Sequence, residues 1–142
     1  MLADQLKIAQ ADAFTLYLKA HFYHWNIEGP NFPQYHEFLN DFYQDVFDSV
    51  DTIAELIRTL DVYAPGTLSR FQSLTTIEES DTVPNAMQMM KNLLEENKMI
   101  LETLKKTYKM ADEENQIGIA NFLQDRIQAH EKHGWMLRSI TK

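Results

Sequence analysis

Two histidines and two carboxylates in one stretch of the chain could bind a transition metal. His24 and His36 come first, and Asp51 and Glu55 follow with a spacing of four residues. Histidine nitrogens and carboxylate oxygens are the usual protein ligands of iron, manganese and zinc. The stretch therefore predicts a metal site, provided that the fold brings these four side chains together.

Long helices are expected to position these residues. Only four glycines and four prolines occur in 142 residues, and three of those eight lie between Gly29 and Pro33. On either side of this break, apolar residues recur every three or four positions, which is typical of helices with one buried face. We expect helices over about residues 3–27 and 33–60, with Pro33 in the first turn of the second helix.

Two more helices are expected in the second half of the chain. The third should begin near Asp81 or Thr82, with Pro84 in its first turn, and the fourth should follow an acidic link over residues 111–114. The connection over residues 61–80 is too long for a tight turn and contains a candidate short helix, Leu68–Leu74. This pattern predicts an all-α, ferritin-like four-helix bundle, formed as a single domain by residues 1–142.

Composition excludes several classes of protein. The net charge of −8, with no basic extension expected at either end, argues against a nucleic-acid surface. The absence of cysteine excludes disulfides and thiolate metal sites. No signal peptide or membrane-spanning run is visible, so the expected location is the cytoplasm and no membrane partner is expected.

The candidate ligands on the second helix share one face. At about 100° per residue, Asp51 lies about 60° and Glu55 about 100° from His36 around the axis. The apolar face of that helix lies about 130° from the centre of this stripe, so the candidate ligands point away from the helix's own bundle. Three further acids fall on a third face and are interpreted as solvated surface: Asp41, Asp45 and Asp48.

His36 and Asp51 are too far apart to share a metal ion within one chain. Fifteen residues of helix span about 22 Å. Antiparallel packing against the same helix of a second copy, around a two-fold axis near Tyr43 and Gln44, would bring His36 of one chain opposite Asp51 of the other. His24 would fold back beside His36 across the turn. The sequence thus predicts two symmetric sites per dimer, with histidines from one chain and carboxylates from the other.

Simpler interpretations of these residues remain open. A histidine on a helix stripe often packs in a core or an interface, and an Asp and a Glu four apart are often a surface pair. The conjunction of all four on one stripe favours the metal site. A zinc-binding structural bundle is a further alternative, because two histidine pairs have a spacing of three: His21 with His24, and His130 with His133.

The motifs around these residues resemble those of the Dps family, the starvation-induced mini-ferritins. The likeness is carried by His24-Trp25-Asn26, Gly29-Pro30-Asn31-Phe32, His36-Glu37, Asp51, Ala54-Glu55 and Ile57-Arg58, and by His130-Glu131-Lys132 with Trp135-Met136-Leu137-Arg138 near the end. The resemblance implies a hollow shell of twelve subunits that stores ferric mineral. It also implies ferroxidase sites between subunits, where Fe(II) is oxidised by hydrogen peroxide or dioxygen.

The resemblance also assigns roles to residues. It implies that Asp51 and Glu55 hold the tighter iron with His24 from the partner, while His36 serves a second position. Zinc or manganese could occupy the same site. Trp25 matches a tryptophan beside the site, where it could exchange an electron or pack the dimer. Asp125 and Glu114 could line the iron-entry pores, although Asn121 stands where an acid is expected.

One position departs from the family pattern. An acid usually follows the first histidine of the second helix by four residues, and here that position is Asn40. A neutral amide is a poorer ligand for a hard cation than a carboxylate. The neighbouring Asp41 points about 100° away and cannot replace it. The second iron position is therefore expected to be weaker. DNA compaction, the other property associated with this family, is disfavoured by the negative charge.

Overall fold

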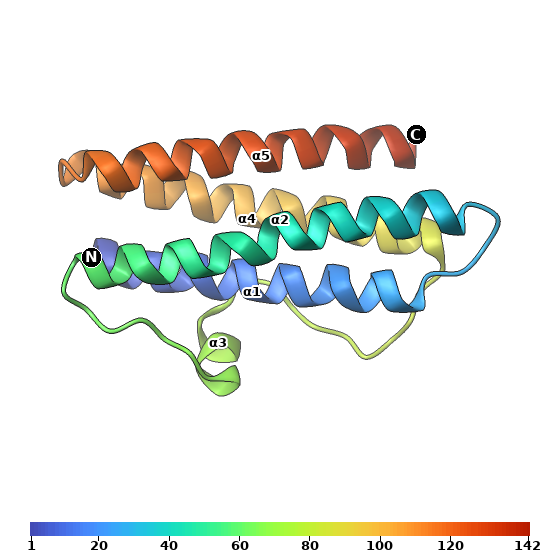
Figure 1. Cartoon of the computed structure of the whole chain (residues 1–142), viewed down its shortest axis with the longest axis horizontal. Coiled ribbons are helices and arrows are strands. Elements are labelled where there is room, and N and C mark those ends of the chain that lie inside the picture. Colours follow the sequence, from blue (N-terminus) through green and yellow to red (C-terminus); the bar gives the residue numbers. More distant parts are fainter.

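The computed structural model describes residues 1–142 as a bundle of helices (Figure 1). The four long helices are α1 (Leu2–Asn26), α2 (Phe32–Thr59), α4 (Ala86–Glu113) and α5 (Ile117–Thr141). The short helix α3 (Leu68–Leu74) lies in the long connection between α2 and α4. The predicted all-α bundle, with a short helix in its crossover, is confirmed. None of the helices combines the length and the hydropathy that crossing a membrane would require.

Two helical hairpins make up the bundle. α1 runs antiparallel to α2, α4 runs antiparallel to α5, and the crossover with α3 passes along α1 (Figure 1). The turn between α1 and α2 depends on Gly29, whose φ of +126° is in a region that L side chains rarely adopt. Pro33 then lies in the first turn of α2, where its missing N–H costs nothing. This turn is what returns the chain beside the end of α1.

The limits of α4 differ from the prediction. The helix begins at Ala86 rather than near Asp81 or Thr82, because the Asn85 side chain caps it by accepting a hydrogen bond of 2.8 Å from the backbone N–H of Gln88. Pro84 disfavours a helical conformation for the residue before it, so it precedes the helix. At the other end, the predicted acidic link mostly belongs to α4, which continues to Glu113.

The core lies between the two hairpins and is apolar. Large side chains from all four long helices are almost fully buried there, among them Leu6, Leu16, Phe42, Ile53, Leu93, Leu104 and Leu123. Burying such a side chain contributes about 1.5–3 kcal/mol to stability. The buried face of α4 includes Met90, Asn97 and Leu104, whereas Met87 is 37% exposed.

Asp12 connects the crossover to the bundle through hydrogen bonds. This carboxylate is fully buried and accepts hydrogen bonds from the hydroxyls of Thr75 (2.7 Å), Thr76 (2.8 Å) and Thr103 (2.7 Å). It also accepts one from the backbone N–H of Thr76 at 2.7 Å. A single side chain of α1 thus holds both the crossover and α4, which fixes the long connection in place.

Asp45 joins α2 to α5, and its prediction as solvated surface was wrong. Its carboxylate accepts two hydrogen bonds of 2.9 Å from Arg126 and one of 2.7 Å from Nε2 of His133. Burial acts to raise the pKa of Asp45, but the hydrogen bonds from His133 and Arg126 outweigh it and hold the pKa well below its usual range. The periodicity of α2 alone could not reveal these partners on α5.

His130 completes this network and has no free ring nitrogen. Its Nδ1 donates to the side-chain oxygen of Asn97 at 2.8 Å, and its Nε2 accepts from Arg126 at 3.1 Å. Complete burial, followed by the charges of Arg126 and His133, lowers the pKa of His130 well below its ordinary value, so the ring is neutral. The pair of His130 and His133 therefore stabilises the fold. His130 has no free ring nitrogen that could bind zinc, as the zinc alternative requires.

Replacing Asp12 by alanine should destabilise the fold strongly. Hydrogen bonds to a charged group contribute about 1.5–3 kcal/mol each, and the substitution also leaves buried hydroxyls unpaired, so we expect a loss of about 3 kcal/mol or more. Urea unfolding at fixed protein concentration measures it. Asp48→Ala is the matched control, because Asp48 is exposed, and it should change stability by less than about 0.5 kcal/mol. Equal effects of the two substitutions would contradict the role given to Asp12.

Asp45→Asn should destabilise the protein in a pH-dependent way. Breaking a buried ion pair costs about 3–5 kcal/mol, and partial exposure of this carboxylate reduces the expected loss to about 2 kcal/mol. Because the folded pKa lies below the unfolded value of about 3.9, the stabilisation is present above that pH and is lost as the pH falls through the folded pKa.

Unfolding of wild type and Asp45→Asn across the pH range tests this expectation. The difference in unfolding free energy should persist at neutral pH and shrink below about pH 4. The control is Asp41→Asn, an exposed acid on the same helix. A difference that stayed constant down to pH 3 would mean that the charge of Asp45 does not stabilise the fold.

Candidate metal centre

The hairpin of α1 and α2 brings His24 and His36 into direct contact. Their rings stack with centroids 3.7 Å apart and planes inclined by 15°. Nδ1 of His24 lies 2.9 Å from the backbone carbonyl oxygen of His36, and Nδ1 of His36 lies 2.9 Å from that of His24. The predicted return of His24 to His36 across the turn therefore agrees with this geometry.

These reciprocal hydrogen bonds determine which ring nitrogen is free. A carbonyl oxygen can only accept, so each Nδ1 must carry the proton and donate it. In the neutral ring, Nε2 then holds the lone pair. Histidines that bind metals usually donate their other N–H to a backbone carbonyl or a carboxylate in this way, which fixes the ring orientation. Both histidines are thus held in the form that can coordinate a metal through Nε2.

Aromatic side chains enclose the two rings. Phe32 stacks on His36 with centroids 4.8 Å apart, and Tyr43 contacts His24 edge-on at 5.3 Å. Both histidines are partly buried. Their hydrogen bonds and ring contacts already orient them, which lowers the entropic cost of coordination.

The carboxylates form a separate half of the site. Asp51 and Glu55 are exposed on α2, and neither makes a hydrogen bond or an ion pair within the chain. Because α2 is unbroken from Phe32 to Thr59, Asp51 lies about 22 Å from His36 along the axis. No cluster of three or more histidines and acids that could hold a metal occurs in the chain. Within one chain, the predicted histidine ligands and the predicted carboxylate ligands are thus separate.

Asn40 lies on the histidine half of the candidate site. Its side chain is partly buried, and its amide oxygen accepts a hydrogen bond of 3.1 Å from Nε2 of Gln44. The oxygen is neutral and already engaged within the helix. Asp41 is exposed and has no contact with the histidines. The weak second position predicted from the sequence is compatible with this arrangement.

A stacked aromatic cluster beside the histidines was missed from the sequence. His21 lies between Trp25 (centroids 3.9 Å apart) and Tyr43 (3.9 Å, planes inclined by 10°). Its Nδ1 lies 3.0 Å from the hydroxyl of Tyr17. Burial, and then the neighbouring His24, lower the pKa of His21. The recurrence of Tyr17, His21 and Trp25 every four residues on α1 was the available signal, since such residues share a helix face.

The pairing of His21 with Tyr17 also bears on the zinc alternative. The rings of His21 and His24 are tilted, with centroids 5.8 Å apart. Nδ1 of His21 is engaged by Tyr17, and Nδ1 of His24 by a carbonyl. The two rings have separate partners, and nothing in their geometry directs them to one shared ion.

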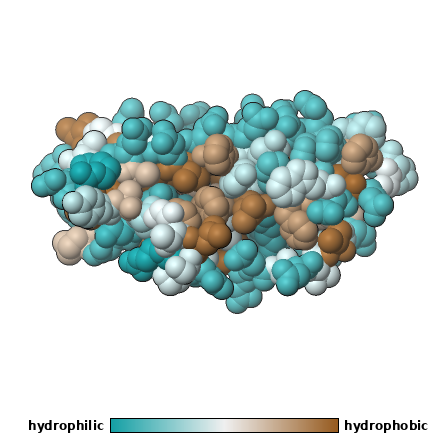
Figure 2. Space-filling view, turned by 60° about the horizontal axis from the view of Figure 1, so that its bottom comes forward, coloured by the Kyte–Doolittle hydropathy of each residue, from teal (hydrophilic) through white to brown (hydrophobic).

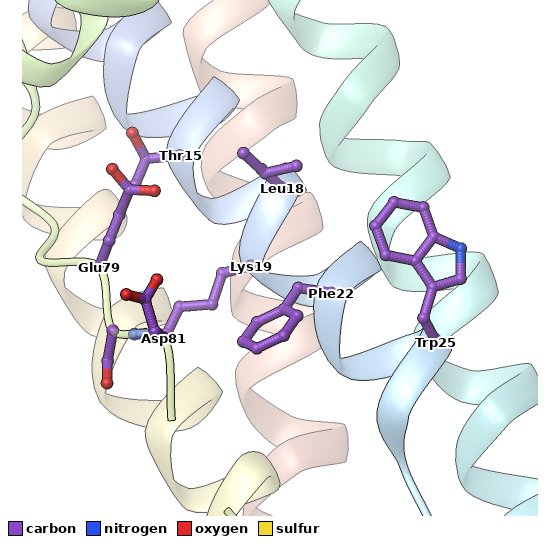
Figure 3. Close-up of a pocket in the computed structure, with 8 residues that line it drawn as sticks. Thr15, Leu18, Lys19, Phe22, Trp25, Glu79 and Asp81 are labelled. Atoms are coloured by element: carbon purple, nitrogen blue, oxygen red, sulfur yellow. The ribbon is translucent and has the colours of Figure 1, made fainter. Parts of the chain in front are cut away.

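A pocket of about 290 Å³ lies on the outer side of α1, next to Trp25 (Figure 3). Trp25 stands at the end opposite to Glu79 and Asp81 of the crossover. Lys19, also in its wall, is held by Glu96 at 2.5 Å and by the carbonyl of Glu78 at 3.1 Å. The pocket is thus bordered by acids and one paired lysine, and it is separate from the histidine pair.

Hydrophobic side chains gather on the face that α1 and the crossover present (Figure 2). Trp25 is 60% exposed, Phe47 on α2 is 50% exposed, and Leu68 on α3 is 72% exposed. Exposed apolar surface of this kind usually marks contact with another protein. Of these three residues, Trp25 directly follows His24 and contacts His21.

The two residues predicted to line pores lie near the connection of α4 and α5. Glu114 directly follows the last residue of α4, and Asp125 lies two turns into α5; both are exposed. Asn121 lines a small cavity of about 210 Å³ at this end of the bundle. A pore needs several subunits, so the roles of Asp125 and Glu114 stay predictions.

Comparison with known proteins identifies the family. Residues 3–142 match the ferritin-like domain. A low temperature-induced protein of Nostoc is 34% identical over 132 residues, which are 92% of this chain and 74% of that protein. The DNA protection during starvation protein of Helicobacter pylori is 31% identical over 135 residues, 94% of each chain.

A solved structure supports the same family assignment. The Dps protein of Vibrio cholerae, described as a member of a broad superfamily of ferritin-like diiron-carboxylate proteins, has a TM-score of 0.95 at 27% identity. The alignment covers 99% of this chain and 89% of that one. With the fold, the histidine pair and these relatives in agreement, the chain belongs to the Dps family of ferritin-like proteins.

Proposed function

We propose that this protein is a ferroxidase that detoxifies and stores iron. It oxidises Fe(II), with hydrogen peroxide as the main oxidant, at sites shared between two copies of the chain. The ferric product is stored as mineral inside a shell of twelve subunits. The observation that supports this most directly is the reciprocal hydrogen bonding of His24 and His36, which leaves both Nε2 atoms available. Family membership supplies the identity of the metal.

The two half-sites supply complementary ligands. Asp51 and Glu55 of one chain and His24 of the other bind the first Fe(II), and His36 serves the second position. Anionic oxygen donors stabilise Fe(III) relative to Fe(II), so they make the bound iron easier to oxidise. Three protein ligands leave coordination positions open for the oxidant. The carboxylates have no partner within their own chain, so they are available to bind a metal together with histidines of a second copy.

The same geometry supports the two-fold dimer. Antiparallel packing of α2 on α2 about an axis near Tyr43 brings the histidine half of one chain opposite the carboxylate half of the other. The exposed Trp25, Phe47 and Leu68 would be covered at such an interface, so burial of apolar surface would stabilise it. Six dimers of this kind make up the proposed shell.

DNA binding has weaker support. Relatives carry the name DNA protection during starvation protein, but this chain has a net charge of −8. Binding to phosphates depends on clustered basic side chains and the release of counterions. Five of the lysines lie along α4 and are interleaved with Glu95 and Glu102, which reduces the positive potential there. We therefore do not extend the proposal to DNA.

Mixed dimers test whether two chains share each site. One chain carries His24→Ala and His36→Ala, and the other carries Asp51→Ala and Glu55→Ala. Each double variant alone should oxidise Fe(II) no faster than buffer does, because every site lacks half of its ligands. After co-assembly, half of the dimers are mixed and one of the two sites in each is complete, so about a quarter of wild-type activity should return.

The control for this experiment is Asp41→Ala with Asp48→Ala. It removes two exposed acids from α2 without touching the ligand stripe, and it should leave peroxide-dependent Fe(II) oxidation unchanged. If co-assembled chains form normal shells but recover no activity, the ligands do not combine across subunits. Full activity in either double variant alone would show that the substituted residues are not ligands of the site.

Asn40→Asp should strengthen the second metal position. It adds a carboxylate on the ligand stripe, so a second Fe(II) is expected to bind on the order of tenfold more tightly. Anaerobic calorimetry with Fe(II) measures both affinities. Gln88→Glu adds the same charge at an exposed position on α4 and should change neither affinity. Unchanged second-site binding in Asn40→Asp would show that Asn40 does not limit this position.

A further inference from the structure

The pocket beside Trp25 has an apolar wall and an acidic end. Leu18, Phe22 and Trp25 of α1 form the apolar wall, and Glu79 and Asp81 of the crossover lie at the end opposite to Trp25 (Figure 3). At about 30 Å³ for each water-sized group, its volume of about 290 Å³ takes roughly ten non-hydrogen atoms. None of the proposed iron ligands lines it. The pocket is thus large enough for a small molecule, and it is distinct from the candidate metal centre.

The one cation in the wall of this pocket is already neutralised. Nζ of Lys19 donates to Oε1 of Glu96 at 2.5 Å and to the backbone carbonyl oxygen of Glu78 at 3.1 Å. Only 11% of the Lys19 side chain and 12% of the Glu96 side chain are exposed. An anion in the pocket would be attracted by the ammonium group and repelled by the carboxylate beside it. Lys19 therefore does not make the pocket a site for anions.

The free polar atoms around the pocket are hydrogen-bond acceptors. Glu79 and Asp81 are exposed, and neither carboxylate takes part in an ion pair within the chain. Oε2 of Glu96 is buried and has no hydrogen-bond partner. The hydroxyl of Thr15 donates to the carbonyl oxygen of Ala11 at 2.8 Å, so it can only accept from a ligand. These atoms lack a donor, and a positively charged donor bonds most strongly to carboxylates.

The apolar wall distinguishes an organic cation from a metal ion. Trp25 is 60% exposed, and Leu18 and Phe22 are partly buried, so a ligand with a hydrocarbon part would remove their surface from water. A metal ion would leave this wall bare. It would also need more oxygen ligands than two carboxylates supply, and no group of three or more histidines and acids that could hold one occurs in the chain.

We propose that this pocket binds a small organic amine of roughly ten non-hydrogen atoms. Its ammonium group lies between Glu79 and Asp81 and donates to both carboxylates. Its hydrocarbon part lies along Leu18 and Phe22 toward Trp25. Two unpaired carboxylates and an exposed apolar wall are thus satisfied by one molecule. The proposal does not depend on the ferroxidase function, because none of these residues is a proposed iron ligand.

The alternative occupant is a second copy of the chain. Trp25 contacts His21, which stacks on Tyr43 of α2, so this end of the pocket adjoins the proposed two-fold interface. If the same interface covered Glu79 and Asp81 as well, the assembled protein would have no free pocket. Binding therefore has to be measured on the assembled full-length protein.

Calorimetric titration with three probes of matched shape tests the proposal. Phenethylammonium combines an aromatic ring with an ammonium group and is close to the size of the pocket. Phenethyl alcohol has the same body without the charge, and hydrocinnamate has a similar body with the opposite charge. At low salt, wild type should bind the amine at least about fivefold more tightly than the alcohol, and the carboxylate more weakly than either.

A charge-removing double variant tests the acidic end of the pocket. Glu79→Gln with Asp81→Asn keeps the size of both side chains, so it should weaken binding of the amine at least about fivefold and leave binding of the alcohol unchanged. The matched control is Glu102→Gln with Asp48→Asn, which removes the same two charges at exposed positions on α4 and α2. It should bind the amine as wild type does.

Tryptophan emission locates the bound amine. The chain has two tryptophans, so Trp135→Phe leaves Trp25 as the only indole. In this variant the amine should change the emission of Trp25, with half of the change at the dissociation constant found by calorimetry.

Three results would overturn the proposal. The first is equal binding of the amine by wild type and by the double variant of Glu79 and Asp81. The second is binding of the amine without a change in Trp25 emission, which would place it elsewhere. The third is no binding to the assembled protein, which would mean that a second copy covers the pocket.

Discussion

The reciprocal hydrogen bonds between His24 and His36 are the interaction on which the candidate site depends. Each ring orients the other through the partner's backbone carbonyl, so neither can be placed without the other. This arrangement requires the end of α1 and the start of α2 to lie side by side, which the left-handed conformation of Gly29 allows. A side chain at that position would strain the turn. The backbone conformation of this turn thus leaves both Nε2 atoms free to bind a metal.

The acids of this chain divide into two groups by their partners. Asp12 and Asp45 have their oxygens filled by hydrogen bonds from other elements, and they hold the crossover and α5 in place. Asp51 and Glu55 have no partner in the chain and face solvent. An acid that is saturated by protein donors has little capacity left for a metal, whereas an unpaired pair four residues apart on a helix can bind one. This difference separates the structural carboxylates, Asp12 and Asp45, from the proposed metal ligands, Asp51 and Glu55.

Helical periodicity predicted much of this structure because it reports on the face that a single helix buries. The α1–α2 hairpin, the short helix in the crossover and the shared stripe of His36, Asp51 and Glu55 could all be derived that way. Pairings between distant elements could not. Asp45 meets Arg126 across 81 positions of sequence, and nothing in the pattern of α2 indicates that a guanidinium stands opposite. The start of α4 was misplaced for a local reason, since Pro84 disfavours a helical conformation of the residue before it and Asn85 caps the helix that follows.

The stacked position of His21 could not be predicted either, because it depends on a contact between α1 and α2. This position changes the interpretation of His21 as a possible zinc ligand. From the sequence, His21 could only be paired with His24 as a possible zinc ligand, because they lie three residues apart on one helix. In the structure its ring is occupied on both faces, by Trp25 and Tyr43, and its Nδ1 by Tyr17. A histidine with these neighbours is poorly placed to bind a metal ion. The two histidines of α1 thus have different surroundings: Nε2 of His24 is left free by the hydrogen bond at Nδ1, whereas the ring of His21 is enclosed by three aromatic side chains.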